Sequence, residues 1–67
     1  MLNENMKKLR ADKELSMKEL SLRSGVSERY LYFIENGEKT PSMKTARLIA
    51  NALGSTIESL FFAPSEN

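Results

Sequence analysis

The sequence predicts a single all-α domain covering residues 1–67, and three observations lead to this class. Apolar residues recur at helical spacing, no segment shows the alternating β-branched pattern of a strand, and glycines and capping residues divide the chain into five short helices. At 67 residues, folding buries only about 60% of the surface that the unfolded chain exposes. We therefore expect marginal stability, which self-association would improve.

The first two expected helices are marked by an apolar face and by their end residues. The first covers residues 2–13, and its apolar face carries Leu2, Met6 and Leu9. The second follows Ser16, because Ser16 and Glu19 form a capping box in which each side chain accepts a hydrogen bond from the other residue's amide. Gly25 ends this helix, since it supplies the positive φ that a tight turn needs.

The third expected helix begins after Ser27, a candidate N-cap, with Glu28 placed favourably against the positive end of the helix dipole. Asn36 and Gly37 end it after about nine residues. Leu31 and Ile34 share its inner face, with Val26 in the turn beside them. The outward face then carries Glu28, Arg29, Tyr32 and Phe33.

Two more helices are expected after a polar loop at residues 37–41. Ser42 caps the fourth, Gly54 closes it, and its apolar stripe consists of Met43, Ala46, Ile49, Ala50 and Leu53. Ser55 or Thr56 begins a short fifth helix that contains Ile57, Leu60 and Phe61. Residues 63–67 are expected to form a frayed tail.

The composition argues against catalysis and against a membrane location. The chain has no Cys and no His, so it lacks disulfides, thiol nucleophiles, sulfur ligands for zinc and the commonest general base. We expect neither an enzyme nor a metal or cofactor. No apolar run approaches the ~20 residues of a membrane span, and the first residues lack the apolar stretch of a signal peptide, so a cytoplasmic location is expected.

The net charge is only +1, but the charges are unevenly distributed. Residues 1–47 hold all ten Lys and Arg with seven acids, whereas residues 48–67 hold two acids and no base. A polyanionic partner should therefore meet the first two thirds of the chain. A solvated, mildly polarised surface is the alternative interpretation.

Residues 16–37 carry a resemblance to a known family. They read Ser-Met-Lys-Glu-Leu-Ser-Leu-Arg-Ser-Gly-Val-Ser-Glu-Arg-Tyr-Leu-Tyr-Phe-Ile-Glu-Asn-Gly, which resembles the helix-turn-helix of the Cro and phage-repressor (Xre-like) regulators. Matching core or turn positions are Leu20, Ser21, Gly25, Val26, Leu31 and Ile34, followed by Pro41-Ser42 and Ala-Leu-Gly at 52–54. The likeness extends over residues 3–61. It implies a compact five-helix bundle of the lambda-repressor-like type that regulates transcription by binding double-stranded DNA.

The helix-turn-helix geometry has a physical basis in the small residues of the unit. Two short helices can pack crosswise only if small side chains meet at their crossing, and Ser21 and Gly25 are expected to permit this approach. The second helix of the unit then fits the major groove, while the first lies across the DNA backbone.

The outward face of the third helix supplies the expected base contacts. Arg29 matches guanine O6 and N7, and Glu28 either accepts from cytosine N4 or only favours the helix dipole. Ser27 can cap its helix and still reach a base edge or a phosphate. Tyr32 and Phe33 are expected at thymine methyl groups, with two alternatives: Phe33 folds back onto the domain, or Tyr32 donates to a phosphate.

Phosphate contacts are expected from residues around the same helix. They are the backbone amide of Met17, the hydroxyl of Tyr30, and the side chains of Asn36, Lys39, Thr40 and Lys44. Met17 stands where relatives commonly have glutamine, so a side-chain contact is either lost or replaced by an apolar one. The resemblance also implies a structural ion pair between Arg10 and Glu35.

The expected protein is a homodimer that binds a two-fold symmetric operator, as a repressor or, alternatively, an activator. The dimer surface is assigned to Leu60, Phe61 and Phe62, with Phe62 crossing the two-fold axis beside Met1 or Leu2. The alternative is that Phe62 caps the chain's own core. A rival interpretation is an antitoxin-like protein-interaction module with secondary DNA binding, suggested by Leu22 at a normally polar surface position.

Overall fold

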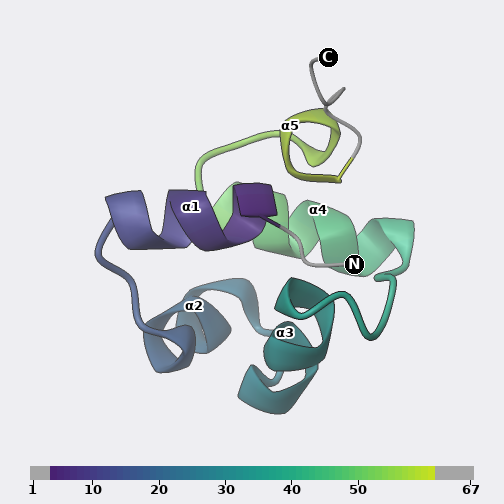
Figure 1. The fold of residues 1–67 in the computed structure, drawn as a ribbon, viewed down its shortest axis with the longest axis horizontal. Coiled ribbons are helices and arrows are strands. Elements are labelled where there is room, and N and C mark those ends of the chain that lie inside the picture. The colour runs from purple at the N-terminus through teal and green to yellow at the C-terminus, as the bar shows by residue number, and fades with distance from the viewer. Residues whose placement is uncertain (1–3, 62–67) are drawn as a thin grey trace.

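The computed structural model describes residues 4–61, which form five helices and no strand within that range. The helices are α1 (Glu4–Asp12), α2 (Met17–Ser24), α3 (Glu28–Glu35), α4 (Met43–Ala52) and α5 (Ile57–Phe61). Helices α2 and α3 lie together on one side of α1 and α4, and α5 lies on the opposite side (Figure 1). The expected all-α, five-helix bundle is confirmed. None of the helices in residues 4–61 has the length and apolar character needed to cross a bilayer.

The helices begin at hydroxyl caps that the sequence predicts. Ser16 Oγ accepts from the amide of Glu19 at 3.1 Å, and Glu19 Oε1 accepts from the amide of Ser16 at 3.0 Å, so the capping box is formed. The other caps are Ser27 on the amide of Tyr30, Ser42 on that of Thr45, and Thr56 on that of Ser59. Each cap gives a partner to an amide that the helix itself leaves unpaired. Thr56, and not Ser55, therefore starts the fifth helix.

Helices α1, α3 and α4 end in the same left-handed turn. In α3, the amide of Gly37 donates to the carbonyl of Ile34 at 3.0 Å and the amide of Glu38 donates to that of Phe33 at 2.8 Å. The turn residues are Gly37 (φ 78°), Gly54 (φ 65°) and Glu14 (φ 55°). Glu14 is the one non-glycine residue with positive φ among residues 4–61, so α1 ends in a conformation that disfavours its own side chain.

The core draws buried side chains from every helix. They are Met6 from α1, Met17 and Leu20 from α2, Leu31 and Ile34 from α3, Ala46, Ile49 and Ala50 from α4, and Leu60 from α5, joined by Leu15, Val26 and Leu53. Met43, assigned to the apolar stripe of the fourth helix, is 57% exposed, so that assignment was wrong. Met43 is the first residue of α4, and the helical periodicity continues to the helix end although the core does not.

The turn between α2 and α3 confirms the positive φ expected at Gly25 and corrects the second role expected for it, close approach of the two helices. A Cβ at this position would meet no atom within 4 Å, so close helix crossing does not require glycine there. Glycine is required instead by the φ of 79° at this position, because this left-handed conformation is strained for other residues. Ser21 stabilises the turn by donating a 2.6 Å hydrogen bond from Oγ to the carbonyl of Val26.

Candidate nucleic-acid interface

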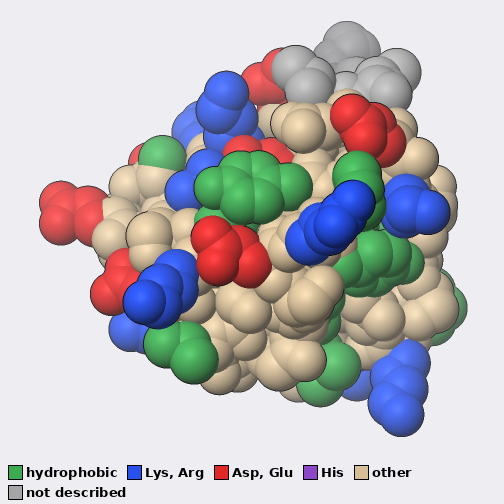
Figure 2. Space-filling model, turned by 90° about the horizontal axis from the view of Figure 1, so that it is seen from below, with side chains coloured by type: hydrophobic (Ala, Val, Ile, Leu, Met, Phe, Trp, Pro, Cys, Tyr) green, Lys and Arg blue, Asp and Glu red, His purple; other side chains and the backbone are tan. Residues whose placement is uncertain are grey.

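Helix α3 turns one face into the core and the other into solvent. Leu31 and Ile34 are buried, whereas Ser27, Glu28, Arg29 and Tyr32 are exposed, with Tyr32 at 48%. Figure 2, a view from the side of α2 and α3, shows basic side chains interspersed with acidic and apolar ones on this face. Because the cations are not gathered into one patch, sequence-independent attraction to DNA should be modest, and the placement of single side chains matters more.

An open hollow of about 570 Å³ lies along the exposed face of α3. It is lined by Glu28, Arg29, Tyr32, Phe33, Asn36 and Glu38. Four of the five expected base-reading residues therefore share one concave surface, while Ser27 lies outside its lining. The hollow combines hydrogen-bond donors, acceptors and aromatic surface, which is the mixture that base edges and thymine methyl groups require.

Phe33 is less outward than the sequence suggests, because its side chain is half-buried. The Cζ atom of Arg29 lies 5.8 Å from the centroid of its ring, and Nζ of Lys39 lies 5.6 Å from it. Arg29 and Phe33 stand four positions apart on one helix, a spacing that brings side chains together and could have indicated this pair. The approach of Lys39 depends instead on the path of the following loop. Sequence reasoning therefore missed this cluster.

The expected phosphate-contacting residues fall into two groups. Asn36, Lys39, Thr40 and Lys44 are exposed, whereas Tyr30 is half-buried and packs against the core. Met17 is 3% exposed, so the apolar side-chain contact to DNA that the sequence allowed is wrong. Met17 lies one turn before Leu20 on the inner face of α2, which directs its side chain into the core. Its backbone amide remains in the first turn of α2, where helix amides lack partners.

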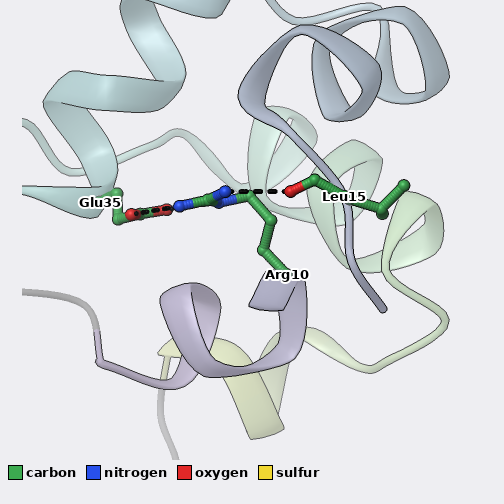
Figure 3. A network of polar contacts seen from close by, with 3 residues as sticks. All are labelled: Arg10, Leu15 and Glu35. Atoms are coloured by element: carbon green, nitrogen blue, oxygen red, sulfur yellow. Dashed lines mark hydrogen bonds and ion pairs between the residues drawn. The ribbon is translucent and has the colours of Figure 1, made fainter. Parts of the chain in front are cut away.

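Arg10 and Glu35 form the expected ion pair, which is bidentate (Figure 3). Arg10 Nε donates to Glu35 Oε1 at 3.1 Å, Nη2 donates to Oε2 at 3.0 Å, and Nη1 donates to the carbonyl of Leu15 at 2.9 Å. Hydrogen bonding to Glu35 raises the pKa of Arg10, while burial acts in the opposite direction. One guanidinium thus joins α1, α3 and the segment between α1 and α2, and its charge is neutralised.

The C-terminal end of the described chain corrects part of the expected dimer surface. Leu60 is 2% exposed and belongs to the chain's own core, so it is not available to a second copy. Phe61 is half-buried and packs against that core. Phe62, Met1 and Leu2 lie outside the described residues.

Leu22, the acidic side chains and Arg29 also bear on function. Leu22 is 77% exposed on α2, as the sequence suggests. Among residues 4–61, no three His, Cys, Asp or Glu side chains converge in a way that could hold a metal ion. Among residues 4–61, the single ion pair joins Arg10 to Glu35. Arg29 therefore has no carboxylate within ion-pair distance in that range.

Comparison with known proteins supports a single family. A helix-turn-helix family model matches residues 6–60. The chain is 37% identical over 54 residues to an uncharacterized HTH-type transcriptional regulator, y4dJ, of Sinorhizobium fredii, covering 81% of this chain and 70% of that protein. It is 34% identical over 61 residues to an uncharacterized HTH-type transcriptional regulator of Archaeoglobus fulgidus, covering 91% and 86% respectively. No solved structure matches the chain significantly.

Proposed function

This chain belongs to the Xre-like (Cro/C1-type) helix-turn-helix family of DNA-binding transcriptional regulators, and we propose that it represses transcription as a homodimer on a two-fold symmetric operator. The observation that carries this proposal is the exposed face of α3, where Arg29 has no carboxylate partner among residues 4–61. An unneutralised guanidinium in the first turn of a recognition helix is available to bind a base edge.

The base contacts are assigned to the outward face of α3. Arg29 donates two hydrogen bonds to guanine, Glu28 accepts from cytosine, and Ser27 at the helix N-terminus reaches a base edge or phosphate. Tyr32 and Phe33 supply apolar surface near thymine methyl groups. This set reads a short half-site in the major groove.

Phosphate contacts fix the orientation of α3 in the groove. They are assigned to the backbone amide of Met17, the hydroxyl of Tyr30, and the side chains of Asn36, Lys39, Thr40 and Lys44. These contacts carry no sequence information, so they should strengthen binding to operator and random duplexes alike.

The homodimer follows from the limited reach of one recognition helix. A single helix contacts only a few base pairs, whereas two helices placed about 34–36 Å apart read half-sites ~10 base pairs apart. The proposed surface is the C-terminal end, with Phe61 and Phe62. Phe62→Asp should then give a folded monomer that binds one half-site weakly. A Phe62→Asp protein that sediments as a dimer and protects both half-sites would remove this surface from the proposal.

Binding sites selected from random duplexes provide the test of sequence-specific recognition. Arg29→Ala should cost about 1–3 kcal/mol on the selected operator and relax the preference at one position of each half-site. Lys44→Ala should weaken binding to every sequence and reduce the slope of log affinity against log salt by about 1. Lys7→Ala, an exposed cation of α1 outside the proposed contacts, is the matched control.

Two results would contradict the proposal. Failure of random duplexes to converge on any sequence would remove specific recognition. Equal losses for Arg29→Ala on operator and random DNA would remove Arg29 as a base-reading residue. Repression itself is tested with a reporter whose promoter overlaps the selected operator, where the protein should lower expression and an increase would indicate activation.

A second candidate function is supported by the 77% exposure of Leu22. In an antitoxin-like module, this side chain would contact a partner protein, and DNA binding would be secondary. Leu22→Ser should then abolish a stoichiometric complex with a protein encoded beside this chain and leave duplex binding unchanged. Persistence of such a complex in the Leu22→Ser protein would exclude Leu22 from its interface.

A further inference from the structure

Phe33 attracts two cationic side chains to its ring. The Cζ atom of Arg29 is 5.8 Å from the ring centroid, and Nζ of Lys39 is 5.6 Å from it. Both distances fall within the roughly 6 Å over which an aromatic face attracts a cation. Arg29 reaches the ring from one turn earlier on α3, whereas Lys39 reaches it from the loop that follows the helix.

Backbone hydrogen bonds also hold the loop after α3 against Phe33. The carbonyl oxygen of Phe33 accepts hydrogen bonds from the amide of Glu38 at 2.8 Å and from that of Lys39 at 3.2 Å. Gly37, at a φ of 78°, allows the chain to reverse at this point. Lys39 therefore contacts Phe33 twice. Its backbone amide donates a hydrogen bond to the Phe33 carbonyl, and its ammonium group lies over the Phe33 ring.

Neither Arg29 nor Lys39 is neutralised by an ion pair within residues 4–61, so both can bind an acceptor on DNA. Among residues 4–61, the ion pair joins Arg10 and Glu35, so neither Arg29 nor Lys39 has a carboxylate within ion-pair distance in that range. The hollow that contains Arg29 and Phe33 also includes Glu28 and Glu38 in its lining. An aromatic ring orients a cation without carrying an opposite formal charge, so the N–H donors of both groups can still meet an acceptor.

We propose that Phe33 is a positioning residue whose ring presents Arg29 and Lys39 as a pre-formed pair, so that a base contact and a phosphate contact are made together. The proposal rests on the DNA-binding function proposed above. Side chains ordered before binding lose less conformational freedom when the complex forms, and for two long cations this difference corresponds to about tenfold in affinity. Phe33 thus acts on DNA through its two neighbours, in addition to the apolar surface proposed for it above.

Fluorination of the Phe33 ring tests the proposal with little change of shape. Fluorine withdraws electron density from the ring face, and pentafluorophenylalanine reverses the electrostatic attraction for a cation. We expect the dissociation constant for the selected operator to rise stepwise with the number of fluorine atoms, to about tenfold at five. Measurement at low temperature keeps every variant folded, and circular dichroism melting checks this directly.

Two substitutions at the same position provide the matched comparison. Phe33→Leu keeps an apolar side chain but removes the ring, so it should lose affinity by a similar factor. Phe33→Tyr keeps the ring and should recover most of that loss. In the free protein, ring-current shifts of the Arg29 Hδ and Lys39 Hε protons should be present with Phe or Tyr at position 33 and absent with Leu. A role in packing alone would move the melting midpoint without a graded effect of fluorine.

The outcomes separate this proposal from the one on which it rests. A flat fluorine series in a protein that still selects its operator overturns the positioning role of Phe33 and leaves DNA recognition intact. Tighter binding on fluorination overturns it as well, because the ring would then be holding the cations away from DNA. A wild-type protein that selects no duplex overturns both proposals.

Discussion

Replacement of Arg10 by methionine tests the ion pair that joins α1 to α3. The methionine side chain preserves part of the apolar packing of the arginine stem but removes three hydrogen bonds, two to Glu35 and one to the carbonyl of Leu15. The Glu35 carboxylate would then remain largely buried without a partner. That unpaired charge, and not the lost attraction alone, should dominate the effect.

The expected size of the effect follows from the burial of the two side chains. Removing one partner of a fully buried pair costs about 3–5 kcal/mol. Here the side chains of Arg10 and Glu35 are 20% and 9% exposed, so we expect the lower end, about 3 kcal/mol. A chain of this length has a total stability of roughly 3–10 kcal/mol. A loss of about 3 kcal/mol in so small a domain should lower the melting midpoint by about 12–24 °C.

A double-mutant cycle measured by urea unfolding separates the ion pair from packing. Glu35→Leu should also destabilise the protein, because it leaves the guanidinium without its carboxylate. The double variant should recover most of the loss and remain about 1 kcal/mol below the wild type, since the Leu15 carbonyl stays unpaired. We therefore expect a coupling free energy of about 2 kcal/mol or more between the two positions.

Additive single losses in this cycle would refute the reasoning. A coupling below about 0.5 kcal/mol is the value expected for residues that do not interact. It would mean that the pair contributes little in solution and that α1 is held to α3 by apolar packing. A change in the slope of the urea transition would instead indicate a change in the unfolded state or an intermediate, so the slopes must agree before the energies are compared.

Three further predictions concern the ends of the helices. Ser16→Ala removes the N-cap of α2 and should destabilise the protein by about 1 kcal/mol in urea unfolding, and an unchanged midpoint would mean that the cap is not formed in solution. Glu14→Gly relieves the left-handed strain at the end of α1 and should raise the stability of the protein by up to about 1 kcal/mol. A loss of stability would show that the glutamate side chain contributes more than the strain costs. Gly54→Ala introduces the same strain at φ 65° and should destabilise the protein by about 1 kcal/mol, because the added Cβ, 3.6 Å from Lys13 Nζ, makes only an ordinary contact and the backbone strain decides the effect. A neutral Gly54→Ala protein would contradict the strain argument.

The features predicted best from the sequence are those decided over a few residues. The caps at Ser16, Ser27 and Ser42 form as expected, because a hydroxyl and an amide three residues apart need only the local backbone to meet. The ion pair of Arg10 and Glu35 spans 25 positions, and it came from the family resemblance and not from local pattern. Long-range geometry was accessible only where a relative's pattern supplied it.

The errors lie at helix ends and in a loop. Met17 and Met43 each occupy the first position of a helix, yet one is buried and the other is exposed. Periodicity assigns a residue to a face but does not say how far along the helix the core extends. The approach of Lys39 to Phe33 depends on the turn at Gly37, which the sequence marks as a helix end without giving the path of the chain beyond it. The individual DNA contacts remain predictions.

Three methionines in residues 4–61 differ in burial, so the order in which they are oxidised reports on local opening of the fold. Met6 and Met17 are 0% and 3% exposed, whereas Met43 is 57% exposed. Peroxide converts an accessible thioether to a polar sulfoxide, which a surface tolerates and a packed interior does not. Among these three, Met43 should therefore gain oxygen first with the fold intact. Sulfoxide at Met17 would form only when the start of α2 opens, so its rate of formation, followed by mass spectrometry, measures how often the helix-turn-helix unit loses its packing.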